Sequence, residues 1–68
     1  MNKIVIGYWH LRDLPGLPYK HQDELPFSND NLLNIIMIVL NAGYNSMIQR
    51  VDNNEVFVWI DKGRFGQS

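Results

Sequence analysis

The first patterned segment of the chain covers residues 3–9, where apolar side chains fall on both faces of an extended backbone. With a period of two residues, these side chains divide into one set of Ile4, Ile6 and Tyr8 and another of Val5, Gly7 and Trp9. Both sets are largely apolar, which is typical of a strand that is covered on both faces. We therefore predict that residues 3–9 form the central strand of a small sheet.

A helical pattern covers residues 29–42. Ser28 precedes it with a hydroxyl suited to an N-cap, and Phe27 and Leu32 have the spacing of a hydrophobic staple. Gly43 follows the segment and favours the left-handed conformation of a Schellman ending. These signals predict one helix with both ends defined.

The predicted helix carries more apolar surface than contact with one sheet requires. Its polar stripe is narrow and consists of Asp30, Asn34 and Asn41. The side chains that face away from this stripe are Leu32, Ile35, Ile36, Val39 and Leu40, and the flanks hold Leu33, Met37, Ile38 and Ala42. A helix on a sheet needs an apolar stripe of only about 100°. The surplus flank, with Met37 and Ile38, therefore predicts contact with a second copy of the chain or burial by the loop that precedes the helix.

Residues 46–61 are predicted to form a β-hairpin that turns at Asn53 and Asn54, because asparagine tolerates the positive φ of a tight turn. A two-residue loop pairs Val51 with Val56, Gln49 with Val58 and Met47 with Ile60 on the face toward the helix. On the far face it pairs Arg50 with Phe57 and Ile48 with Trp59. The far face is thus predicted to present two aromatic rings beside an arginine.

Residues 10–27 fit neither period and contain all three prolines, each after a leucine. The segment is too apolar for a solvated loop, and long loops of this kind are often functional. We expect an ordered loop that lies across the sheet as a strap. Residues 63–68 are broken by glycine and are expected to form a flexible tail.

Together these elements predict one α+β domain over residues 1–68. Its expected architecture is a single-layer antiparallel sheet of about three strands packed on one helix, in the order β-loop-α-β-β. A chain of 68 residues is marginally stable, and the absence of cysteine excludes disulfides, but 46% hydrophobic residues argue for a folded core.

The overall charge and hydropathy narrow the classes of function. A formal net charge of −1 makes nucleic-acid binding an unlikely expectation, since such domains are usually basic. The longest apolar stretch, Leu32 to Leu40, is interrupted by Asn34 and is too short to span a membrane. No secretory signal is visible at the N-terminus, so a cytoplasmic protein is expected.

The predicted far face is the strongest candidate for a functional site. This candidate consists of Arg50, Phe57 and Trp59, joined by Trp9 or Tyr8. Its composition is that of a protein interface, in which tryptophan, tyrosine and arginine are enriched. The same aromatic rings could stack the bases of a single-stranded nucleic acid. A third interpretation is that the proline-containing loop covers them and that they are part of the core. The sequence leaves these three interpretations open.

The remaining candidate chemistry lies in and beside the loop, where histidines and carboxylates of the types that bind zinc occur together. These residues are His10, Asp13, His21, Asp23 and Glu24. Their spacing matches no metal motif, so a small metal-dependent enzyme centred on His10 and His21 is kept only as an alternative. The chain has no cysteine or threonine, and no serine stands beside a candidate base. We therefore expect no catalysis, no metal and no cofactor.

The function expected from these features is that of a non-catalytic protein-binding module, forming a homodimer and binding another protein. Its expected contacts are Arg50, Phe57, Trp59 and Trp9 on the sheet, with Met37 and Ile38 on the helix. The small size, the lack of cysteine and the initial methionine are typical of phage or mobile-element proteins that inhibit a host protein complex. An inhibitor of this kind is the more specific expectation.

Overall fold

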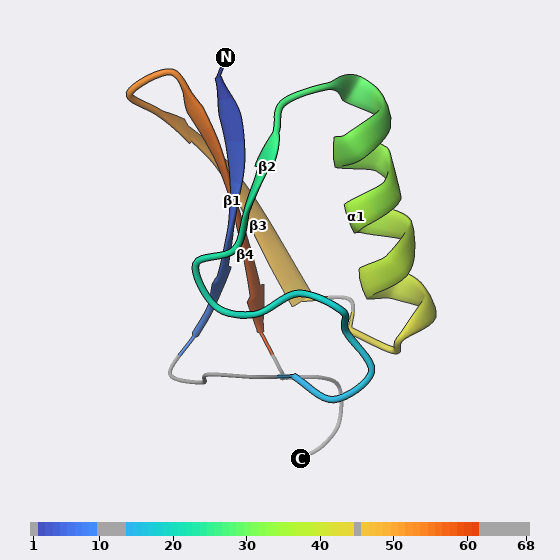
Figure 1. The fold of residues 1–68 in the computed structure, drawn as a ribbon. Coiled ribbons are helices and arrows are strands. Elements are labelled where there is room, and N and C mark those ends of the chain that lie inside the picture. Colours follow the sequence, from blue (N-terminus) through green and yellow to red (C-terminus); the bar gives the residue numbers. More distant parts are fainter. Residues whose placement is uncertain (1, 10–13, 45, 62–68) are drawn as a thin grey trace.

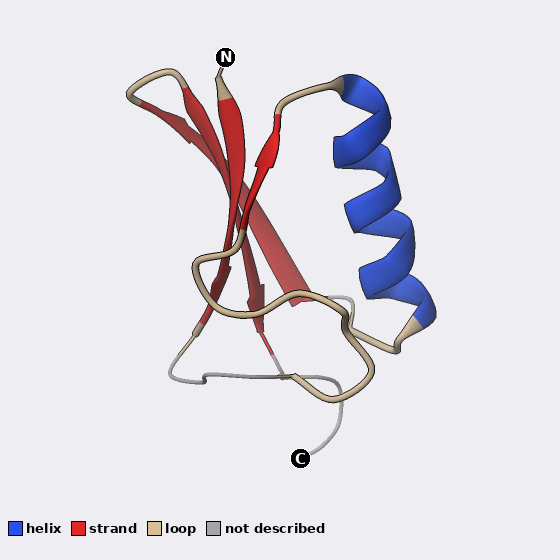
Figure 2. Cartoon of the chain, in the orientation of Figure 1, coloured by secondary structure: helices blue, strands red, loops and turns tan. Residues whose placement is uncertain are grey.

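The computed structural model describes residues 2–9, 14–44 and 46–61. Its elements are β1 (Lys3–Tyr8), β2 (Glu24–Pro26), α1 (Asn29–Asn41), β3 (Ser46–Asp52) and β4 (Glu55–Asp61). The strands form one sheet in the order β2-β1-β4-β3, and α1 lies against one face of it (Figure 1). Figure 2 shows the two layers, with the helix on one side of the strands. The predicted α+β class and the order of the main elements are confirmed.

The sheet differs from the expected one in strand number and direction. It has four strands, and it is mixed, because β1 pairs antiparallel with β2 but parallel with β4. The additional strand β2 has three residues and ends at Pro26, so it is too short to show a period of two. The parallel pair arises because the chain crosses the sheet through α1 to its opposite edge, and the hairpin then brings β4 back beside β1.

The predicted central position of the first strand is confirmed. Ile4, Ile6 and Tyr8 are fully or almost fully buried between the sheet and α1. On the other face of β1, Val5 is only 4% exposed. The strand is therefore covered on both faces, as its apolar composition indicated.

Both ends of α1 follow the predicted capping pattern. The Ser28 hydroxyl oxygen accepts a hydrogen bond from the Asn31 backbone N–H at 3.0 Å. At the other end Gly43 has a φ of 96°, and the Tyr44 N–H donates to the Val39 carbonyl at 3.1 Å, as in a Schellman motif. Within the described residues, no helix is long and apolar enough to cross a membrane.

One position of the helix was predicted wrongly. Ile35 and Val39 are fully buried as expected, but Leu40 is 46% exposed. The loop covers one flank of α1 at Ala42, where a β-carbon on Gly16 would lie 3.6 Å from the Ala42 β-carbon. Leu40 lies on the other flank, which no described loop residue covers.

The hairpin has the predicted register throughout, including Arg50 opposite Phe57 and Ile48 opposite Trp59. Asn53 and Asn54 have φ values of 51° and 65°, which are the positive angles of a mirror-image two-residue turn. The β4 side chains on the helix side (Val56, Val58 and Ile60) are buried in the core.

The described part of the long loop packs mainly on the helix side of the sheet, and the His21 ring lies beside Trp59 on the far face. Leu14 is buried in the core, the Tyr44 hydroxyl donates to the Pro15 carbonyl at 2.8 Å, and the Tyr8 hydroxyl donates to the Tyr19 carbonyl. The loop therefore closes one end of the core between helix and sheet. Residues 10–13 and the predicted tail, 63–68, lie outside the described residues.

Candidate functional site

The sheet face opposite α1 is called here the open sheet face, because the helix packs on the other side (Figure 1) and, of the described loop, the His21 ring lies beside Trp59 on this face. Its side chains alternate along each strand with those that enter the core. The residues on this face are Glu24 of β2; Lys3, Val5 and Gly7 of β1, followed by Trp9; Glu55, Phe57 and Trp59 of β4; and Ile48, Arg50 and Asp52 of β3.

Trp59 is the centre of an aromatic cluster on this face. It pairs with Gly7 in the parallel register, and a β-carbon on Gly7 would lie 2.5 Å from the indole. The indole therefore lies across β1 in the space that the glycine leaves. The Trp9 ring centroid is 5.3 Å away at an interplanar angle of 41°, and that of His21 is 6.0 Å away. Both separations lie in the range of favourable aromatic contact.

Beside this cluster the surface forms a shallow depression of about 160 Å³, lined by Arg50, Asp52, Phe57 and Trp59. Arg50 and Asp52 are exposed, whereas Phe57 and Trp59 are half-buried. The structure thus brings together three residues that the sequence singled out. Asp52 is not among the predicted site residues, although it has the same strand parity as Arg50 and so points to the same face.

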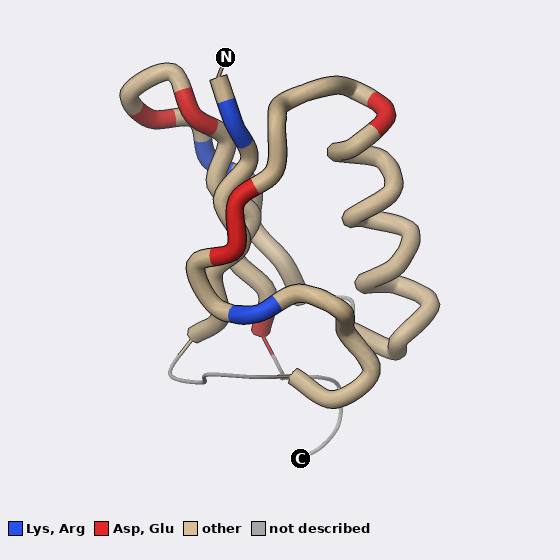
Figure 3. The backbone as a smooth tube through the Cα atoms, viewed as in Figure 1, with Lys and Arg blue, Asp and Glu red and all other residues tan. Residues whose placement is uncertain are grey.

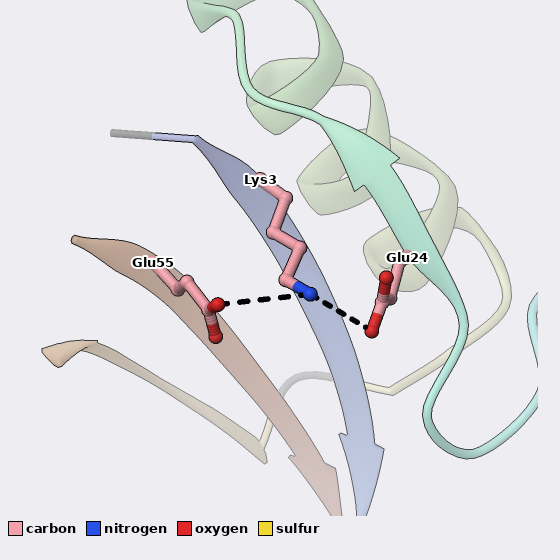
Figure 4. Close-up of polar contacts among 3 residues, drawn as sticks. All are labelled: Lys3, Glu24 and Glu55. Carbon is pink, nitrogen blue, oxygen red and sulfur yellow. Dashed lines mark ion pairs between the residues drawn. The ribbon is translucent and has the colours of Figure 1, made fainter. Parts of the chain in front are cut away.

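The hairpin end of the open sheet face is acidic. The Lys3 Nζ atom lies 3.1 Å from a carboxylate oxygen of Glu24 and 3.6 Å from one of Glu55, so it links three strands (Figure 4). Hydrogen bonding to Glu24 raises the pKa of Lys3 against the opposing effect of desolvation. With Asp52 opposite Glu55, three carboxylates stand there beside two basic side chains, Lys3 and Arg50. Figure 3 shows acidic and basic segments next to each other at this end of the sheet. These groups together have a small excess of negative charge.

Arg50 lies exposed beside the aromatic rings of the depression. Within the described residues Arg50 makes no ion pair. The two ion pairs found there are both made by Lys3. A guanidinium group can stack on an aromatic ring or bind a carboxylate through two parallel hydrogen bonds.

The other predicted contact residues lie elsewhere or at the border. Trp9 is 39% exposed at the end of the aromatic cluster. Met37 is 56% exposed, and Ile38 is half-buried, but both belong to α1 on the opposite side of the sheet. The predicted residues therefore form two separate surfaces.

The histidine and carboxylate side chains of the loop have structural contacts in the described residues. His21 Nδ1 accepts a hydrogen bond from the Tyr8 N–H at 3.0 Å, which fastens the loop to the end of β1. The Asp23 carboxylate accepts from the Lys20 N–H at 2.8 Å, and Glu24 is the partner of Lys3. His10 and Asp13 lie outside the described part of the chain. No group of three or more potential metal ligands occurs among the residues that are described.

The open sheet face therefore combines an aromatic cluster, a small depression and an arginine that makes no ion pair with another described residue. No family model matches the sequence, and no curated protein or solved structure is significantly similar to the chain.

Proposed function

We propose that this chain is a non-catalytic protein-binding module that acts through the open sheet face. The observation that carries the proposal is the depression between Arg50, Phe57 and Trp59, where half-buried rings adjoin a charged group without an ion pair in the described structure. Tryptophan and arginine dominate the binding energy of protein interfaces when they surround a small pocket. Trp9 extends the same surface at the end of β1.

The size of the depression favours a protein partner over a small ligand. Sites for cofactors and substrates usually enclose about 300–1,000 Å³. The volume here is about 160 Å³ and suits one inserted side chain of a partner. Arg50 could then pair with an acidic residue beside that side chain.

The charge of the surroundings favours protein over single-stranded nucleic acid, which remains the second candidate. Bases could stack on Trp59 and Trp9, but phosphates need several cations along the binding track. The border of this face instead holds Glu24, Glu55 and Asp52. Lys3 is engaged by two of these carboxylates, and Asp52 lines the depression with Arg50, so this part of the described structure offers few free cations to a phosphate backbone.

A module of this size leaves little rigid scaffold for catalytic geometry. It could act by occupying a surface that a larger complex needs, as small phage or mobile-element inhibitors do. We propose this inhibitory role as the specific form of the function.

The binding face is tested by capturing proteins from a lysate of the source cells on the tagged chain and identifying the captured protein by mass spectrometry. Its affinity is then measured for the wild type, Trp59→Ala and Arg50→Glu. Each variant should bind at least about tenfold more weakly, because removing an interface hot spot costs more than 1.4 kcal/mol. Circular dichroism should show that both variants remain folded.

Lys20→Glu is the matched control for charge, since Lys20 is exposed on the loop away from the depression. It should bind as the wild type does. Equal affinity of all four proteins would refute the proposed face. Quenching of tryptophan fluorescence by an oligonucleotide at low salt, reversed by added salt, would instead favour the nucleic-acid function.

A further inference from the structure

The described residues expose several large apolar side chains, which are Trp9, Leu33, Met37, Leu40, Ile48 and Val51. Two of them, Ile48 and Val51, belong to the edge strand β3. We infer that this edge is a dimer interface, in which β3 pairs antiparallel with β3 of a second copy about a two-fold axis.

The exposed apolar flank of α1 points away from the sheet. On the opposite flank, the Asn31 side-chain amide donates to the Pro26 carbonyl of β2 at 2.8 Å, and Ala42 lies against the loop at Gly16. Met37 is two residues, or about 200° of rotation, from each of Ile35 and Val39, which are buried against the sheet. The dimer contact is therefore placed along β3 and not on the helix.

The two edges of the sheet are unequal in a way that favours pairing at β3. The edge strand β2 has three residues and ends in proline, so it offers little backbone to another chain. Strand β3 has seven residues, without proline, lysine or a bulge. Its exposed Ile48 and Val51 lie on opposite faces of the strand. A long, regular edge strand with exposed apolar side chains can pair with another chain.

The backbone groups available for pairing follow from the hairpin geometry. Asp52 and Glu55 flank a two-residue turn and form a hydrogen-bonded pair. Because such pairs alternate along an antiparallel ladder, the backbone N–H and C=O groups of Arg50 and Ile48 also bond to β4. The alternate residues direct their N–H and C=O groups to the outer edge. These residues are Met47, Gln49 and Val51, and in the described structure their outward groups bond to no other strand.

The sequence of β3 is complementary to itself in one register. An axis through Gln49 pairs all seven residues, with Met47 opposite Val51 of the second copy and Ile48 opposite Arg50. Moving the axis to Arg50 would place two guanidinium groups opposite each other. Moving it to Val51 would pair Arg50 with Asp52 but would reach the turn at Asn53 and leave Ile48 unpaired.

In this dimer the sheet has eight strands, and both helices lie on the same face of it. The two depressions lie on the other face, one on each side of the axis. The inference does not depend on the proposed function, because a chain that binds its partner as a monomer would contradict only the dimer.

The test is the molar mass of the untagged chain by light scattering and sedimentation equilibrium over a concentration series. The wild type should reach about twice the monomer mass of 8.0 kDa. Val51→Lys should have half the mass of the wild type at the same concentration, since a lysine on an edge strand opposes pairing with another strand. Val51 is exposed, so this variant should remain folded.

Asn34→Lys adds the same charge on the exposed polar stripe of α1 and should dimerise as the wild type does. A wild-type chain that stays monomeric throughout would overturn the inference, and so would a Val51→Lys variant that still dimerises.

The register has a separate test, because the chain has no cysteine. Gln49→Cys should form a disulfide-linked dimer severalfold faster than Arg50→Cys or Val51→Cys under mild oxidation. Residues opposite each other at the axis have α-carbons about 5.5 Å apart, within the range of a disulfide. Faster linking through position 50 or 51 would overturn the register.

Discussion

Gly7 and Trp59 form the contact on which the shape of the open sheet face depends. A glycine within a strand costs about 0.5–1 kcal/mol relative to alanine and has no side chain to pack. Here the indole of Trp59 fills the space above it and meets Trp9 and His21 at its edges. The glycine thus lets the tryptophan lie flat on β1 and keeps it at the wall of the depression.

Gly7→Ala should displace the Trp59 indole from β1, because the added β-carbon would lie 2.5 Å from the ring. We expect a loss of about 1–2 kcal/mol in the free energy of unfolding, as is typical of overpacking, and stronger acrylamide quenching of Trp59. Denaturant unfolding and quenching in a Trp9→Phe background would measure both effects.

The control for this prediction is a double-mutant cycle. In a Trp59→Ala background the space above β1 is empty, so Gly7→Ala should be neutral or stabilising. An equal loss in both backgrounds would mean that the indole does not explain the glycine.

At the scale of elements, α1 and the hairpin are specified by contacts between residues close in sequence. The helix begins at Ser28 and ends in the Schellman motif at Gly43, and both caps were visible in the sequence. The hairpin register follows from the two-residue turn at Asn53 and Asn54. These caps and this turn depend only on residues that are close in sequence.

Ser28→Ala should lower the free energy of unfolding by about 1 kcal/mol, because the Asn31 N–H at the start of the helix would lose its acceptor. Thermal and urea unfolding would measure the change. Ser28→Asp keeps an acceptor at the N-cap and adds negative charge near the positive end of the helix dipole. It should therefore be close to the wild type, and a similar loss in both variants would show that the cap is not the cause.

At the scale of the whole molecule, the long loop is part of the core. Leu14 is 3% exposed, and the hydroxyls of Tyr8 and Tyr44 bond to loop carbonyls at Tyr19 and Pro15. One helix and one small sheet leave the end of their shared core open, and the loop closes it. This arrangement leaves the opposite sheet face without a cover from the described loop, apart from the His21 ring beside Trp59.

Leu14→Ala should cost about 2–5 kcal/mol, the usual effect of removing a buried leucine side chain. Since a domain of this size is stable by only several kcal/mol, the variant should be largely unfolded or should melt far below the wild type. Leu33→Ala, at an exposed position of α1, is the matched control in dilute solution and should change stability little. A Leu14→Ala protein as stable as this control would contradict the role of the loop in the core.

The site could be predicted from the sequence only where it depends on strand parity. Arg50, Phe57 and Trp59 share a face because the hairpin register sets which side chains alternate together. Leu40 could not be placed in the same way. Its exposure depends on which flank of α1 the loop covers, and no helical period contains that information. The use of His21 as a backbone acceptor was equally invisible, because Tyr8 is distant in sequence.

The sequence by itself determined the helix, its caps, the hairpin register and the central apolar strand, because each depends on periodicity or on contacts within a few residues. Only the tertiary structure decided that β1 and β4 are parallel, that Glu24–Pro26 forms a fourth strand, and that the loop lies on the helix side. These features depend on how distant segments share one core. The chain buries Ile4, Ile35, Val58 and Leu14 together only in this arrangement, which leaves the aromatic face and the β3 edge uncovered by the described residues.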